Sequence, residues 1–221
     1  MCQAELPSGV TLRHHLYHPC FFYFFDTFVL LYTTFVGDKI EYTIKMSYLG
    51  PFHILSYGTL LGAEIYQSFI GGTTAYKALP RPQFSTLQNK LFPIYFSLQS
   101  ALPLALALTF PGKFGTSDLS SIYGVIAEEN RYTVLLPLTL ISVSGLVNMF
   151  YLTPLVGKVI KERFQQEAID NKKAYDAPPH SERMTELNKR FGKLHGISSL
   201  LNMGALIATI AYGVYLGNRL H

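Results

Sequence analysis

The chain has 221 residues, of which 49% are hydrophobic and 14% are charged, and its net charge is +4. A soluble domain usually carries about 25% charged residues, so this composition is typical of a multi-pass membrane protein. The positive charge is not gathered into one patch, and the two cysteines, Cys2 and Cys20, form no CxxC pair, which argues against a nucleic-acid partner, a disulfide framework and a zinc module.

The first apolar segment, residues 20–36, is weak. It reads CFFYFFDTFVLLYTTFV, has only 17 residues and contains Asp26. No small-x-small cleavage site follows it, so it does not resemble a signal peptide. A signal anchor, an interfacial segment and a region outside the natural protein all remain open for it.

Four later segments are long and apolar enough to predict membrane-spanning helices, which need roughly 20 residues each. We expect Pro80 to end the first, Pro111 the second and Pro154 the third. The sequence therefore predicts an all-α integral membrane protein, a four-span helical bundle with spans at about 52–78, 91–110, 133–152 and 194–216.

The connection between the third and fourth spans, residues 154–193, has helical character and contains nine Lys or Arg residues. An apolar stripe at helical spacing predicts an amphipathic cytosolic helix there, formed by Leu155, Val156, Val159, Ile160 and Phe164. Two placements remain open for this helix. It lies either at the headgroup surface of the membrane or against the end of the bundle.

The basic residues also predict a topology. The connection between the first two spans contains Lys77, Arg81 and Lys90, and it must lie on the same side as residues 154–193. The positive-inside rule places both connections in the cytosol and the C-terminus on the opposite side. We expect an endomembrane location, with the lipid bilayer and either a second copy or another membrane protein as partners, and no nucleic acid.

Polar side chains within the spans are the candidate functional positions. Glu64 is the least ordinary, because burying an ionisable group in a bilayer costs at least about 2.5 kcal/mol. It shares a helix face with His53, Tyr57 and Ser68, while Gly58 and Gly62 are expected to pack against another helix. The remaining polar candidates are Gln99 in the second span, Asn148 in the third, and His195, Ser198, Ser199 and Asn202 at the start of the fourth. Interhelical hydrogen bonds are the simplest role for the amides and hydroxyls.

Three separated motifs resemble the transmembrane protein 205 family, which is also described as a domain of unknown function. They are YKALPRPQFSTLQNKLFPIYF at residues 76–96, which includes Arg81, then VNMFYLTP at 147–154 and FGKLHGISSLLNM at 191–203. The resemblance implies a small four-span membrane protein with basic cytosolic connections and no established reaction. It also implies a natural start at Met46. Residues 46–221 would then form the membrane domain, and residues 1–45 an N-terminal extension or a gene-model artefact.

Three functions remain open. The first is a non-enzymatic protein of membrane organisation or trafficking, without cofactor, metal or catalytic residue. The second is a small carrier or permeation component, in which Glu64, Gln99, Asn148, His195 and Asn202 line a polar cavity. The third is a membrane enzyme that uses His195 and Glu64 as an acid–base pair. We rank it last, because the two side chains are expected to lie far apart. His195 lies near the cytosolic end of the fourth span, whereas about ten residues, or roughly 15 Å, separate Glu64 from the cytosolic end of its own helix.

Overall fold

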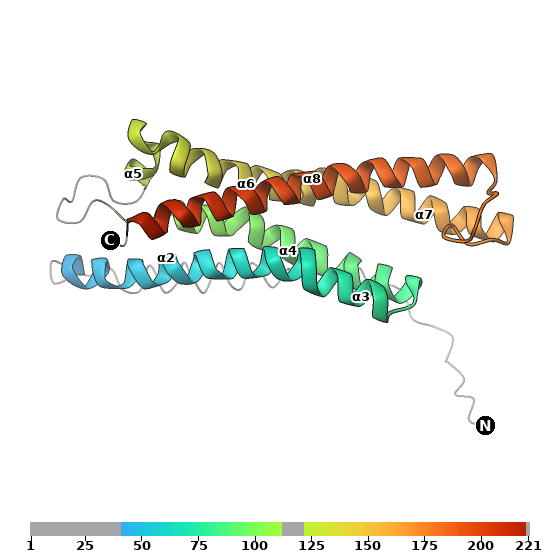
Figure 1. The fold of residues 1–221 in the computed structure, drawn as a ribbon, viewed down its shortest axis with the longest axis horizontal. Helices are drawn as coiled ribbons and strands as arrows, with labels where there is room; N and C mark the ends of the chain where they lie inside the picture. Colours follow the sequence, from blue (N-terminus) through green and yellow to red (C-terminus); the bar gives the residue numbers. More distant parts are fainter. Residues whose placement is uncertain (1–40, 112–121, 220–221) are drawn as a thin grey trace, which may run out of the picture. The chain divides into compact units, whose positions relative to one another are not determined.

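The computed structural model describes residues 41–111 and 122–219, which all belong to one compact unit, Gly37–His221. Within these described ranges every regular element is helical and no strand is present (Figure 1). The weak apolar segment 20–36 and most of the predicted extension lie outside the described residues. The all-helical class predicted from the sequence is therefore confirmed for the described part of the chain.

The helices form four long runs. The first consists of α2 (Glu41–Ile65), the π-helical η1 (Tyr66–Gly71) and α3 (Gly72–Ala78), and the second is α4 (Arg81–Leu108). After the short α5 (Ile122–Ile126), the third run consists of the 3-10 turn η3 (Glu128–Asn130), the π-helical η4 (Arg131–Leu135), α6 (Leu136–Val147), the π-helical η5 (Asn148–Leu152) and α7 (Thr153–Asp170). The fourth run is the single helix α8 (Glu182–Asn218).

Three helices in the described part of the chain are long and apolar enough to cross a membrane, judged by length and composition. They are Arg81–Leu108, Glu128–Asp170 and Glu182–Asn218. The run that begins with α2 is not among them, because polar residues such as His53, Glu64 and Gln67 lower its hydropathy. The second, third and fourth predicted spans therefore each correspond to a helix that is long and apolar enough to cross a membrane, and the first span stays a prediction.

Polar and apolar side chains are distributed as expected for a protein surrounded by lipid. Glu64, Gln99 and Asn148 have no solvent-exposed surface, whereas Leu200 is 75% exposed and Ile207 is 61% exposed. Polar groups in a bilayer must find partners within the protein, while apolar side chains can face lipid tails at little cost. This inverted pattern agrees with membrane insertion of the long helices.

The helices pack closely where small residues allow it. A Cβ atom added to Gly145 on α6 would lie 2.9 Å from the backbone nitrogen of Ser100 on α4, and one added to Gly213 on α8 would collide with the hydroxyl of Tyr57 on α2. By contrast, a Cβ added to Gly58 or Gly62 would meet nothing within 4 Å. The expectation that these two glycines pack against another helix is therefore wrong within the described residues.

The predicted break after the third span is also wrong, because the helix continues through Thr153 and Pro154 to Asp170. Proline lacks an N–H and its ring crowds the carbonyl of the residue four positions earlier. Here that residue is Phe150, which lies in the π-helical turn η5. A wider π-helical turn relieves this crowding, so the proline is tolerated inside a long helix.

The two basic connections lie at the same end of the bundle (Figure 1). There, α3 packs against α4, while α7 packs along α8. The hydrophobic core lies towards the other end, around Leu106, Ile141 and Tyr212. The bundle is thus closed by its core at one end, and its basic end consists of two helical hairpins, α3–α4 and α7–α8.

Candidate functional site

A cavity of about 770 Å³ lies between these two hairpins, and we call it the basic-end cavity. Its lining comes from η1, α3, α4, η5, α7 and α8, together with two residues of the α7–α8 connection. Of the candidates named from the sequence, five side chains line it: Arg81, His195, Ser198, Ser199 and Asn202. The cavity therefore unites the basic turn of the first connection with the polar start of the predicted fourth span.

Aromatic rings supply much of the apolar wall. Phe84, Phe92 and Phe96 come from α4, and Phe164 and Phe191 come from α7 and α8. Phe92 and Phe96 stack with their centroids 5.5 Å apart. The cavity is thus amphipathic, with rings from both hairpins beside charged and hydrogen-bonding groups.

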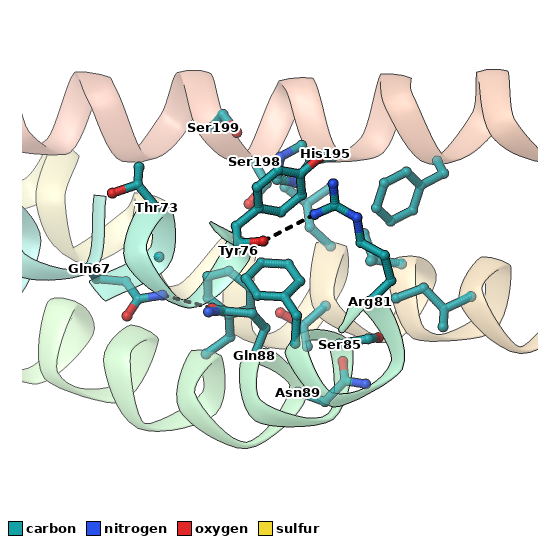
Figure 2. A pocket seen from close by; sticks show the side chains of 18 of the residues that line it. Gln67, Thr73, Tyr76, Arg81, Ser85, Gln88, Asn89, His195, Ser198 and Ser199 are labelled. Atoms are coloured by element: carbon teal, nitrogen blue, oxygen red, sulfur yellow. Dashed lines mark hydrogen bonds between the residues drawn. The ribbon is translucent and has the colours of Figure 1, made fainter. Parts of the chain in front are cut away.

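Arg81 occupies one side of the cavity at the first residue of α4 (Figure 2). Its guanidinium carbon lies 3.5 Å from the ring centroid of Tyr76, and its Nη1 donates to the carbonyl of Tyr76 at 3.3 Å. The cation–π contact holds the guanidinium in place without neutralising its charge. His195 and Ser198 of α8 line the same cavity (Figure 2).

Only part of the positive charge in the lining is neutralised by a carboxylate. Lys173 forms an ion pair of 3.2 Å with Glu167, whose other oxygen accepts from the backbone N–H of Ala174. Within the described residues, no ion pair joins Lys77, Arg81 or Arg163 to a carboxylate. The cavity therefore carries an excess of positive charge.

Two buried donors in the lining lack an acceptor. Gln88, which is 5% exposed, accepts a 2.8 Å hydrogen bond from Gln67, but its own Nε2 has no partner among the described residues. The Nε of Arg163, whose guanidinium lies over the ring of Phe191, is also buried without a partner. A buried donor left unsatisfied costs about 1–3 kcal/mol, so these two groups favour a ligand that brings acceptor atoms.

The polar start of α8 is held by Asn148. Ser198 donates to Asn148 Oδ1 at 2.6 Å, and Asn148 Nδ2 donates to Asn202 Oδ1 at 3.3 Å and to the carbonyl of Ser144 at 2.9 Å. Asn148 is fully buried and begins the π-helical η5. It does not line the cavity, but it orients two side chains that do.

Glu64 and Gln99 lie deeper in the bundle. Gln99 Nε2 donates to Glu64 Oε1 at 3.1 Å and to the hydroxyl of Tyr95 at 3.2 Å, and Tyr95 itself lines the cavity. Glu64 and Gln99 are fully buried and do not line it. The predicted polar cavity that contains Glu64, Gln99 and Asn148 is therefore wrong for these three residues. The same prediction is confirmed for His195 and Asn202, which line the basic-end cavity.

His195 takes no part in an acid–base pair with Glu64. Its ring stacks on Phe191 with a centroid distance of 5.8 Å and an interplanar angle of 4°. Glu64 is sealed within the bundle, whereas His195 is exposed at the cavity. The geometry places the two side chains in separate environments.

The sequence missed two kinds of residue. One is the set of unsatisfied donors, Gln88 and Arg163, which only the arrangement of the hairpins brings to one cavity. The other is a hydrogen-bonded group around His53, whose ring nitrogens lie 2.9 Å from Thr109 Oγ1 and 2.8 Å from the Tyr212 hydroxyl. The shared helix face of His53 and Glu64 was the signal for this second group.

Comparison with known proteins identifies the family of this chain. Residues 55–165 match the family described as Domain of unknown function (DUF4149). The chain is also 32% identical over 175 residues to Xanthocillin biosynthesis cluster protein D of Aspergillus fumigatus, a match that covers 79% of this chain and 93% of that relative. No solved structure matches the chain. The chain therefore belongs to the DUF4149 family.

Proposed function

We propose that the chain is a non-enzymatic integral membrane protein that binds an amphipathic molecule in the basic-end cavity and acts in membrane organisation or trafficking. The observation that carries this proposal is the cavity itself. It encloses about 770 Å³ and combines aromatic walls with unpaired cations and unsatisfied donors. Small-molecule sites are usually concave and mostly apolar, with a few polar groups that fix the orientation of the ligand.

The membrane arrangement belongs to this proposal. We place four spans in the bilayer, with the run from α2 to α3 as the first and the third ending before α7. The basic connections face the cytosol of an endomembrane, and α7 is the amphipathic cytosolic helix, which continues the third helix and packs along α8. The shared end of the two basic connections and the exposed apolar side chains support this placement. Membership of the transmembrane protein 205 family stays part of the same hypothesis.

Carriage of a small biosynthetic product is the second candidate function. The relative from Aspergillus fumigatus is named for a xanthocillin biosynthesis cluster. The cavity volume of about 770 Å³ lies within the range of pockets that bind small molecules. The two candidate functions differ in the molecule that is bound, and both use the same cavity.

The separation of His195 from Glu64 supports a non-enzymatic role. A general acid or base must come within hydrogen-bond reach of the group that it serves, directly or through one water. His195 is exposed at the cavity and stacks on Phe191, while Glu64 pairs with Gln99 inside the bundle. The charged groups of the cavity are better suited to binding than to proton transfer between these two residues.

Photocrosslinking tests the proposal directly. The purified full chain in detergent is irradiated with two diacyl probes that carry a photoactivatable acyl chain, a phosphatidic acid and a phosphatidylcholine. Labelled peptides are then mapped by mass spectrometry. We expect label on cavity-lining residues such as Phe84 and Phe164, and loss of this label in Ser199→Trp, which fills the cavity.

Leu200→Trp is the matched control, because Leu200 is the next residue of α8, is exposed and does not line the cavity. This variant should be labelled as strongly as the natural chain. Labelling by both probes that ignores Ser199→Trp, or that avoids the lining peptides, would contradict the proposed binding function.

A further inference from the structure

We propose that the natural occupant of the basic-end cavity is an acidic glycerophospholipid, whose anionic phosphate headgroup is bound by Arg81, Gln88 and Arg163. This inference rests on the proposed binding function and names the chemical class of its ligand. It follows from three properties of the lining: which hydrogen-bonding atoms are unsatisfied, which charges are unpaired, and where the apolar walls lie.

The unsatisfied atoms at the cavity are donors. Gln88 Nε2 and Arg163 Nε are buried without partners, and both side chains line the cavity. The buried unpartnered acceptors Glu64 Oε2, Gln99 Oε1 and Asn188 Oδ1 belong to residues that do not line it. A ligand that completes the lining must therefore offer acceptor oxygens, and a phosphate offers them in several directions at once.

The charges select an anion over a neutral acceptor. Glu167 is the carboxylate of the lining, and it is already engaged by Lys173 and the N–H of Ala174. Arg81 is held by a π-contact with Tyr76 and a backbone carbonyl, so it keeps its full charge for a ligand. The guanidinium of Arg163 lies over the ring of Phe191, 4.6 Å from its centroid, and it interacts electrostatically with Glu167 without forming an ion pair. Guanidinium groups match the geometry of a phosphate, so each of these two groups, held on an aromatic face at the same cavity, is suited to bind one.

The walls indicate a lipid as the source of the phosphate. Phe92 and Phe96 of α4 face the cavity together with Phe164 and Met203 of the other hairpin. A free phosphate ion would leave these apolar surfaces without a partner, whereas a glycerophospholipid places its proximal acyl chains there. The adjoining helices α4 and α8 are long and apolar enough to span a bilayer, so the cavity lies within reach of lipid molecules.

The two photoactivatable probes named above test this inference, now compared quantitatively. We expect phosphatidic acid to label the lining about tenfold more than phosphatidylcholine, equivalent to one decade in affinity. Arg163→Gln and Gln88→Ala should each remove most of this preference. Arg190→Gln is the matched control, since Arg190 is an exposed cation of α8 that does not line the cavity, and it should keep the preference.

The outcomes separate the two proposals. Equal labelling of the lining by both probes, blocked by Ser199→Trp, would overturn the acidic headgroup and leave the binding function intact. If neither probe labels the lining residues, both the headgroup assignment and the binding function are overturned. Thermal unfolding in detergent shows whether each variant is folded, and a second pair, Arg81→Gln and Arg81→Lys, replaces any variant that is not. A preference unchanged in Arg81→Gln would also overturn the headgroup assignment.

Discussion

Ser198 donates a 2.6 Å hydrogen bond to the side-chain oxygen of Asn148, which lies fifty residues earlier in the chain. The bond joins α8 to the π-helical turn η5, and Ser198 itself lines the basic-end cavity. Asn148 also donates to Asn202, one turn further along α8. A single buried amide thus positions two polar side chains of the cavity and fixes how two long helices meet.

Asn148→Ala should destabilise the protein by about 1–3 kcal/mol, because it leaves the Ser198 hydroxyl and the Asn202 amide without their partner. Thermal unfolding of the purified chain in detergent measures this change. Ser199→Ala is the control, since Ser199 is exposed and makes no hydrogen bond to the described residues, and it should change stability by less than about 0.5 kcal/mol. Equal stability of the two variants would contradict the role given to Asn148.

Glu64→Gln should preserve the fold, whereas Glu64→Leu should destabilise it by about 1–3 kcal/mol. Within the described residues, no ion pair joins Glu64 to a basic side chain, and Glu64 accepts a hydrogen bond from Gln99. Glutamine retains an acceptor for this bond, but leucine leaves the buried amide of Gln99 with one acceptor fewer. The comparison uses unfolding temperature and yield of monodisperse protein. A large loss in Glu64→Gln would show that the carboxyl group itself is needed.

His53 and Tyr212 should be energetically coupled, because His53 Nε2 and the Tyr212 hydroxyl lie 2.8 Å apart in the buried core. His53→Leu and Tyr212→Phe each remove one side of this contact. In a double-mutant cycle, we expect the double variant to lose less stability than the sum of the single variants, by about 0.6 kcal/mol or more. Strict additivity would mean that the contact contributes nothing.

The sequence predicted the long helices well, since continuous apolar runs are a strong signal, and it identified Glu64 and Asn148 as buried polar positions. It could not predict that the third helix passes Pro154, because this depends on the π-helical turn η5 just before the proline. The cavity was equally hidden. Arg163 and Gln88 lie on helices distant in sequence, and only the arrangement of the hairpins makes them share one site.

The topology can be checked by cysteine labelling after Cys2 and Cys20 are replaced by serine. Single cysteines at Gln83 and Ala177 sit near the two basic connections, and one at Glu128 sits at the opposite end of the third run; all three positions are exposed. In sealed vesicles, a membrane-impermeant maleimide should reach the first two from the cytosolic side and Glu128→Cys only from the other side. Reaction of all three from one side would contradict the four-span arrangement.

Gly145→Ala should destabilise the bundle by about 1–3 kcal/mol, although alanine has a higher helix propensity than glycine. The added methyl group would lie 2.9 Å from the backbone nitrogen of Ser100 and 3.1 Å from the carbonyl carbon of Gln99. Backbone atoms cannot rotate away, so α4 and α6 must separate, which disturbs the contact between Gln99 and Glu64. Gly62→Ala is the matched control, because its methyl group meets open space. The two variants differ only in the packing around one methyl group, so equal unfolding temperatures would show that close approach of α4 and α6 does not contribute to stability.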